Sequence, residues 1–314
     1  MGLRMSKIKI RTARAINVNL GLRRTYIKKL IRLKKQFQTF VFEQILVDLD
    51  NAGVMAQDWS LSNPKTAQEK EQLKQLKRKI LREMARHDPE WLRNHIDAFV
   101  QKNLHKWADA FGTGCEQVAS WFVRNQVLSV ANAQKQAIKA AHGTLEVIKK
   151  RWTVPLVRNQ YVAPSVAKMM PDIIKEQASL ITKIAVEDVN RISDVIQQGL
   201  TGGDDLTRLR ETLAQTDGFD SARVERVVVD QTGKANAQIQ IAGAKDLGVQ
   251  YGIWKHVPGL YTSRETHKQM DGKKFDLSVG LYDADVGKNV LPAECINCRC
   301  QFRMCLPDWA TKDD

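Results

Sequence analysis

Apolar residues recur at spacings of three and four along most of the first 200 positions, which is the period of helices that bury one face. One such pattern starts at Thr25 and should end near Asn51–Gly53, because glycine readily takes the left-handed conformation that closes a helix. The clearest stripe runs from Val166 to Gln198. The periodicity therefore predicts a mainly helical region over residues 25–200.

Three more helices are predicted between these two: Thr66 to about His87, a helix that starts at Asp88–Pro89, and Glu116–Lys150. We expect Phe111–Gly114 to separate the second from the third, because glycine weakens a helix interior. The stretch Trp152–Pro164 contains two prolines and is predicted to cross between helices without regular structure.

The pattern changes after Gly203. A short helix capped by Asp204 or Asp205 and a helix from Ser221 to about Lys245 are followed by strand and turn signals. These signals are a strand at Gln250–His256, a hairpin turn at Asp271-Gly272 and a last strand within Arg299–Met304. The predicted fold class is a mainly α N-terminal region followed by a small α+β C-terminal domain over residues 204–314.

Positive charge is concentrated at the start of the chain. The net charge is +14, and no Asp or Glu precedes Glu43, so the 12 cations before that residue leave only +2 for the rest. Residues 1–24 are predicted to be a flexible basic arm that contacts nucleic-acid phosphates together with the cations that follow it. The candidate DNA-binding residues are Arg4, Lys7, Lys9, Arg11, Arg14, Arg23, Arg24, Lys28, Lys29, Arg32, Lys34 and Lys35.

Two other interpretations of the basic arm stay open: a disordered solubilising tail and a mitochondrial-type presequence. The arm lacks interleaved aromatic residues, so stacking on single-stranded bases is not indicated. No apolar run is long enough to span a membrane, and residues 1–20 lack the apolar core of a signal peptide. We therefore expect neither a membrane partner nor export.

Four of the five cysteines lie within eleven residues near the C-terminus. Cys295-x-x-Cys298, with Cys300 two positions later, has the spacing of a zinc knuckle, in which thiolates bind Zn²⁺. His267 or Cys305 is the candidate for a further ligand. The alternative is that these are reduced cysteines that pack the interior of a small domain.

His267 and Asp271 suggest a second kind of chemistry. His267 would act as a general base with Asp271 as its orienting group, but no nucleophile is tied to them in the sequence. We favour the interpretation that Asp271 and Gly272 serve the turn and that His267 is structural.

Several of these motifs, in this order, resemble the phage Mu F-like minor head proteins, also called phage head morphogenesis proteins. The matching features span roughly residues 185–305. They are Asp230-Gln-Thr232, Ala235-Asn236, Trp254, Arg264-x-x-His267-x-x-Met270-Asp271-Gly272 and Pro292-x-x-Cys295-x-x-Cys298-Arg299-Cys300.

The resemblance implies a minor capsid protein of a tailed double-stranded DNA phage, located in the virion at the portal vertex or head interior, and in host cytoplasm during assembly. Its partners would be the portal protein, the packaged double-stranded DNA and a scaffold or major capsid protein. The family's metal positions would here be His267, Cys298 and Cys300, with Cys295 as an addition. These four residues are the candidate ligands of a structural Zn²⁺.

The expected role is head assembly, DNA packaging or DNA delivery without catalysis. Two alternatives belong to other classes of protein. One is a metal-dependent nuclease that uses His267, Asp271 and Glu265, although the carboxylates for a two-metal site are few. The other is a non-catalytic regulator that binds nucleic acid.

Overall fold

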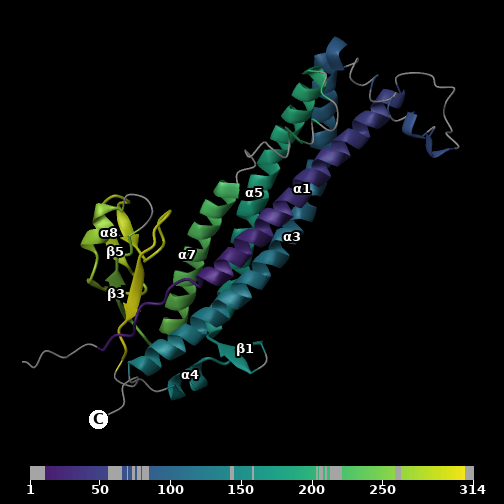
Figure 1. The fold of residues 1–314 in the computed structure, drawn as a ribbon. Helices are drawn as coiled ribbons and strands as arrows, with labels where there is room; N and C mark the ends of the chain where they lie inside the picture. Colours follow the sequence, from purple (N-terminus) through teal and green to yellow (C-terminus); the bar gives the residue numbers. More distant parts are fainter. Residues whose placement is uncertain are drawn as a thin grey trace, which may run out of the picture. The chain divides into compact units, whose positions relative to one another are not determined.

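The computed structural model describes residues 11–55, 85–141, 145–157, 159–202, 221–258 and 263–307, with single positions between 66 and 79 and between 204 and 212 (Figure 1). The cations Arg4, Lys7 and Lys9 lie outside these residues, as does half of the helix predicted from Thr66 to His87. The same holds for most of the short helix predicted after Asp204.

Along the chain, the long helices lie before residue 247 and five of the seven described strands follow them, while the strand pair β1–β2 lies between α4 and α5 (Figure 1). The helices are α1 (Leu20–Met55), α3 (Pro89–Ala140), α4 (Glu146–Arg151), α5 (Pro164–Gly202), α7 (Ser221–Asp246) and α8 (Glu265–Gln269). The strands are β1 (Val154–Val157), β2 (Gln160–Val162), β3 (Tyr251–Lys255), β4 (Lys274–Asp276), β5 (Leu281–Asp283), β6 (Lys288–Val290) and β7 (Gln301–Met304).

The predicted fold class is confirmed, because long helices make up the N-terminal region and strands gather in the C-terminal part. The stripe that predicted α5 lies inward: Val166, Ile173 and Ile192 are all buried. Among the described helices, none combines the length and the apolar composition that a bilayer crossing needs.

The predicted break at Phe111–Gly114 is wrong, because α3 continues through it. Both glycines face neighbouring helices at close range. A Cβ on Gly112 would lie 3.6 Å from the Thr182 hydroxyl, and one on Gly114 would lie 3.4 Å from Leu33. A Cβ at either position would make ordinary van der Waals contacts, so α3 packs against its neighbours here and tertiary packing outweighs the weak helix propensity of glycine.

The stretch Trp152–Pro164 is also more regular than predicted. It follows α4 directly and contains an antiparallel pair of strands, β1 and β2, in which Pro155 is opposite Tyr161. Asn159 has a φ of 61° and turns the chain between them. The proline is accommodated because a two-stranded ribbon has free edges.

A three-stranded antiparallel sheet of order β4-β3-β7 forms the centre of the C-terminal domain. Gly252 on β3 lies between two rings, because a Cβ there would come within 3.1 Å of both Phe275 and Phe302. The Trp254 ring is fully buried and packs edge-on against Phe275. Aromatic side chains on one face of the sheet thus form the core of this small domain.

The turn predicted at Asp271-Gly272 forms, but the prediction that it connects the two strands of a hairpin is wrong. The turn joins α8 to β4, and β4 pairs with β3, which lies earlier in the chain. Gly272 adopts a φ of +77°, and its N–H donates to the Trp254 carbonyl at 3.0 Å. The same turn chemistry is used here to end a helix and lead into a strand.

Two compact units are formed by segments that are distant in sequence: Met1–Ile27 with Val118–Gln177 and Glu225–Asp314, and Lys28–Gln117 with Ala178–Val224. They do not coincide with the linear segments 25–200 and 204–314, because the long helices α1, α3 and α5 each contribute residues to both units.

In the first unit, the described part of the basic arm packs against the C-terminal strands. Ala13 and Ile16 are buried, and the Ala13 N–H donates to the Met304 carbonyl at 2.9 Å. The amides of Asn236 and Gln240 on α7 both donate to the Ile16 carbonyl. Hydrogen bonds with buried partners therefore fix this part of the arm.

In the second unit, Lys34 of α1 forms a buried ion pair with Asp188 of α5, with 2.7 Å between the ammonium nitrogen and a carboxylate oxygen. Gln38 donates to the same carboxylate at 3.2 Å. Lys34 is only 2% exposed. Its inclusion among the DNA-binding candidates is therefore wrong, because its charge already serves a partner inside the protein.

Replacing Lys34 with alanine should lower the free energy of unfolding by about 3 kcal/mol, because buried Asp188 loses its 2.7 Å ion pair and keeps only the longer, 3.5 Å contact with Arg191 and the bond from Gln38. The adjacent exposed cation is the control: Lys35→Ala should change stability by no more than about 0.5 kcal/mol. Urea denaturation followed by circular dichroism measures both. Equal stability of the two variants would contradict a structural role for Lys34.

Candidate metal centre

His267 is placed by the short helix α8, with its side chain directed into the domain. It is 2% exposed, and its ring packs edge-on against Trp254, with 5.6 Å between ring centroids. A buried imidazole needs hydrogen-bond partners on both nitrogens. The structure supplies a carboxylate for one nitrogen and two sulfurs for the other.

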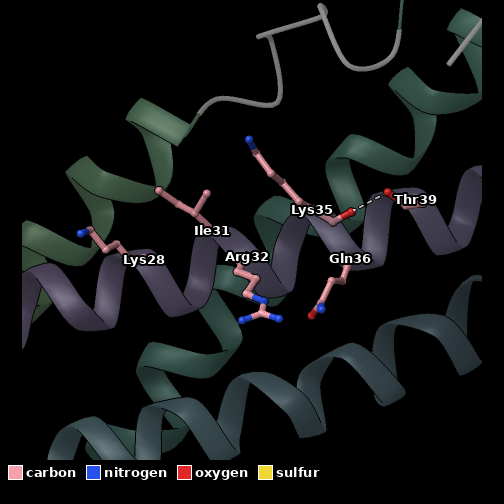
Figure 2. Close-up of a pocket in the computed structure, with 6 residues that line it drawn as sticks. All are labelled: Lys28, Ile31, Arg32, Lys35, Gln36 and Thr39. Atoms are coloured by element: carbon pink, nitrogen blue, oxygen red, sulfur yellow. Dashed lines mark hydrogen bonds between the residues drawn. The ribbon is translucent and has the colours of Figure 1, made fainter. Parts of the chain in front are cut away.

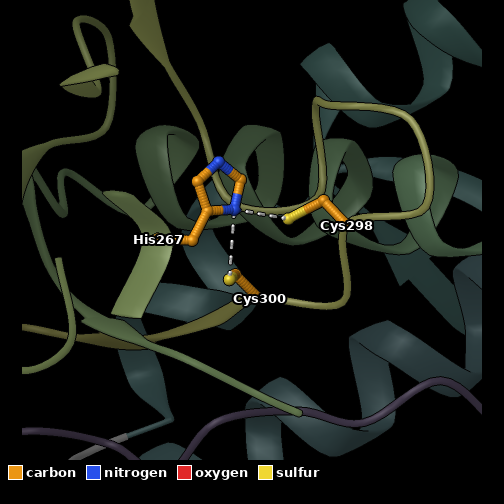
Figure 3. A group of neighbouring side chains, drawn as sticks. All are labelled: His267, Cys298 and Cys300. Carbon is orange, nitrogen blue, oxygen red and sulfur yellow. Dashed lines mark hydrogen bonds between the residues drawn. The ribbon is translucent and has the colours of Figure 1, made fainter. Parts of the chain in front are cut away.

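The Nδ1 atom of His267 faces two thiols (Figure 3). It lies 3.4 Å from Cys298 Sγ and 3.6 Å from Cys300 Sγ. One ligand atom from each of the three residues lies within 4.8 Å of the others, and all three residues are buried. This group can hold a metal ion, since imidazole and thiolate are ligands that transition metals and zinc prefer.

The Nε2 atom of His267 lies 2.9 Å from a carboxylate oxygen of Asp283, which ends β5 and is fully buried. Burial opposes the charged form of Asp283, but hydrogen bonds from Thr266, the Asp285 N–H and His267 outweigh it and lower the pKa of this carboxyl. An ionised Asp283 accepts a hydrogen bond from the N–H at Nε2 of His267. The lone pair of Nδ1 is then directed at the two thiols. Metal-binding histidines are commonly oriented in this way.

The two thiols have opposite pKa shifts. The pKa of Cys298 is raised because it donates to Cys300 and because it is buried. The pKa of Cys300 is lowered because Cys298 donates to it, with a further contribution from the Val257 N–H, although burial opposes the shift. The contact with Cys298 raises the pKa of His267 against the effect of burial. The group therefore stabilises one thiolate, which is the form that binds a metal.

The loop that carries the cysteines is fixed from both sides. The Cys298 N–H donates to the Cys295 carbonyl at 3.0 Å, and Asn297 between them has a φ of 59°. The Asn297 N–H donates to Asp230 of α7 at 2.6 Å, and the Arg264 guanidinium donates twice to the Ile296 carbonyl, at 3.2 Å each. These contacts give Asp230 and Arg264 a structural role at the cysteine loop, although both residues are distant from it in the sequence.

The structure brings three of the four ligands predicted from the sequence into one group. His267, Cys298 and Cys300 form one group, whereas Cys295 falls in a second group with His267 and Asp283. Cys305 belongs to neither group of the described residues and lies where the chain bridges to Thr12. The zinc-knuckle spacing of Cys295 and Cys298 thus does not bring both sulfurs into the first group.

The residues of the nuclease alternative serve other contacts. Asp271 accepts the His256 N–H at 2.7 Å, and Glu265 is exposed and pairs with Lys268 at 2.9 Å. The orienting carboxylate of His267 is Asp283, a residue that the sequence analysis missed. An aspartate in the short segment Tyr282-Asp283-Ala284-Asp285 has no local signal that separates it from a turn residue.

A basic face on α1 is the second candidate site. Lys28, Arg32 and Lys35 are exposed and line an open pocket of about 570 Å³ together with Ile31, Gln36 and Thr39 (Figure 2). The other described candidates that are exposed are Arg11, Arg14, Arg24 and Lys29. Arg23 is half-buried, and burial together with nearby Arg299 and Arg24 lowers the pKa of its guanidinium.

The structure therefore defines a class: a mainly helical protein whose small α+β C-terminal domain encloses a His/Cys group able to hold a metal. Residues 190–303 match the family model described as Phage Mu protein F like protein. The match confirms the resemblance of this segment to the family, and it indicates a role in phage head morphogenesis. Searches of curated proteins and of solved structures found no match to the chain.

Replacing Asp283 with asparagine should weaken Zn²⁺ binding by about 10- to 100-fold, because a neutral amide holds the His267 tautomer less firmly than a carboxylate does. Competition against a chromophoric chelator on the purified full chain measures the affinity. Asp285→Asn is the control, since Asp285 is exposed and bonds Thr266 instead of His267. Equal losses in both variants would contradict a specific orienting role.

Proposed function

We propose that this chain is a non-catalytic minor head protein of a tailed double-stranded DNA phage, which acts in head assembly, DNA packaging or DNA delivery. The observation that carries the proposal is the match of residues 190–303 to the Mu F-like family. The motif residues Asp230, Arg264 and Asp271 support it, because each bonds backbone around the His/Cys group.

The ion in the centre is Zn²⁺ and its role is structural. One imidazole and two thiols are a donor set that suits this ion. Structural zinc sites are closed, whereas catalytic ones keep an open position, and His267, Cys298 and Cys300 are each no more than 8% exposed. Binding of the ion would add directly to the folding free energy of a domain with short strands.

The basic face of α1 contacts the phosphates of the packaged DNA. Lys28, Arg32 and Lys35 lie within a segment of eight residues, whose seven steps cover about 10 Å of helix axis. Duplex DNA carries one negative charge per about 1.7 Å of its axis, so several phosphates fall within this span. Contacts with phosphates do not depend on the base sequence, which suits a protein that binds packaged DNA of any sequence.

The protein is located in the virion, at the portal vertex or in the head interior, with the portal protein as its main partner. The support is the family match, which indicates a phage head context. A low-copy position of this kind predicts few copies per particle, in contrast to the major capsid protein.

Mass spectrometry of purified, protease-treated phage particles tests the proposal. We expect peptides of this chain to be present, protected from protease and far less abundant than those of the major capsid protein. A chain found only in the lysate of infected cells would act before or outside the virion. That result would contradict the minor head assignment.

Alanine at Lys28, Arg32 and Lys35 together should weaken binding to duplex DNA and reduce the slope of log affinity against log salt by about 2 to 3, since each phosphate contact contributes about 0.9. Alanine favours helices, so α1 should remain folded. Fluorescence anisotropy over a salt series measures both quantities.

A matched triple variant controls for net charge. Arg93, Lys102 and Lys106 are exposed on α3 and supply the same three charges. Their replacement by alanine should leave the salt slope within error of the unmodified chain. Equal reductions in the two triple variants would show a general charge effect and contradict a site on α1.

A further inference from the structure

We propose that the open face of the sheet β4-β3-β7 is a second surface that binds the phosphates of duplex DNA. The inference rests on the proposed function, in which the basic face of α1 contacts packaged DNA. It adds a site in the other compact unit, because the sheet lies within Glu225–Asp314 and the basic face of α1 lies within Lys28–Gln117. The open face is the side of this sheet that carries Tyr251, Ile253, Lys255, Lys274, Asp276, Gln301 and Arg303.

The two faces of the sheet differ in burial, because side chains alternate along each strand. The residues of the inner face are all buried, and they are Gly252, Trp254, Phe275, Phe302 and Met304. Every residue of the open face is exposed or half-buried. This face is therefore accessible to a ligand.

Strand register gathers three cations around one apolar side chain. Lys274 of β4 and Arg303 of β7 are both paired with Ile253 of the central strand. They are two strand spacings apart, which is about 10 Å. Lys255 follows two residues further along β3, which is about 7 Å from Ile253. All three cations are exposed, so their charges are available to an anion that spans the sheet.

The charges of the open face are not balanced within the sheet. Three cations and the carboxylate of Asp276 leave it a net charge of +2. The oxygens of Asp276 accept the Gln250 amide at 3.1 Å and the Ser278 N–H at 2.7 Å. The Lys274 ammonium lies over the Tyr251 ring, 4.0 Å from its centroid. Among the residues that the structure describes, none forms an ion pair with the three cations, which therefore keep their charges for a partner.

The basic arm adds a fourth cation beside β7. Thr12 of the arm forms an antiparallel bridge with Cys305. The Ala13 N–H donates to the Met304 carbonyl at 2.9 Å, so the arm extends the sheet by one short segment. Ala13 is buried, and Arg14 after it is exposed. Part of the arm that the sequence predicted to contact phosphates is thus held next to the cations of the sheet.

Duplex DNA fits this face better than a protein partner does. The core of a protein interface is largely apolar, whereas the apolar side chains here are Tyr251 and Ile253, with cations on either side. A duplex carries one negative charge per about 1.7 Å of its axis, so several phosphates fall within the span of about 10 Å between Lys274 and Arg303. Charge complementarity therefore favours DNA.

A single strand fits the face less well than a duplex. Proteins that bind single strands stack the bases on aromatic rings. The open face offers the ring of Tyr251, which is 36% exposed, and the Lys274 ammonium already lies over it. We therefore expect contacts with the backbone phosphates and not with the bases.

Replacing Lys255, Lys274 and Arg303 together with glutamine should weaken binding to duplex DNA and reduce the slope of log affinity against log salt by about 2 to 3, since each phosphate contact contributes about 0.9. Fluorescence anisotropy of the full chain with a labelled duplex over a salt series measures both quantities. Each single glutamine variant should reduce the slope by about 0.9, which keeps the test decisive if the triple variant does not fold.

Two matched triple variants are the controls. Lys255→Arg, Lys274→Arg and Arg303→Lys together keep the three charges and should retain the slope of the unmodified chain. Glutamine at three exposed lysines of α3 and α5 in the same compact unit should also leave the slope within error of that value, and these lysines are Lys139, Lys168 and Lys175.

An unchanged slope in the sheet variants, or an equal reduction in the lysine control, would overturn the inference. A larger loss of affinity for a single-stranded oligonucleotide than for a duplex of the same length would also overturn it. In each of these cases a reduced slope in the α1 variant leaves the DNA contact of the proposed function standing. If the unmodified chain does not bind duplex DNA, both DNA surfaces fail together, so the two failures are distinguishable.

Discussion

The hydrogen bond between His267 Nε2 and Asp283 orients the buried imidazole of the C-terminal domain. Because the buried carboxylate is held in its charged form, it takes the proton-bearing nitrogen and leaves Nδ1 free to face the thiols. Both residues are buried, so the bond is strong and the ring has one orientation. The direction of the Nδ1 lone pair towards the two thiols follows from this one contact.

The remaining motif residues act on backbone near that bond. Asp230 accepts from Asn297, Arg264 donates to Ile296, and Asp271 accepts from His256. Each contact fixes a segment that carries a sulfur or an imidazole. A domain whose strands have three to five residues has a small core, so fixed loops and a bound ion would supply stability that burial alone provides in larger domains.

Burial divides the cations of α1 into two kinds. Lys34 is enclosed with Asp188, while its neighbour Lys35 lies on the exposed face with Lys28 and Arg32. The period of the helix makes this division, because adjacent residues point about 100° apart. Lys34 therefore joins α1 to α5 through an ion pair, while the adjacent Lys35 is exposed and can contact a partner.

The sequence by itself determined what depends on local periodicity and spacing. It predicted a helix over Val166–Gln198, which lies within α5, a helix from Ser221 to about Lys245, the last strand and the fold class. The grouping of His267 with Cys298 and Cys300 was implied by the family resemblance. Only the tertiary structure decided which distant groups meet. Asp283 lies 16 positions from its histidine and His256 lies 44 positions from Cys300, and neither has a local signal. The continuity of α3 through Gly112 and Gly114 likewise depends on packing against Leu33 of α1 and Thr182 of α5. Local patterns indicate which face of a helix or strand is buried. The contacts of Asp283 and His256 and the continuity of α3 depend instead on residues that come close only when the chain folds.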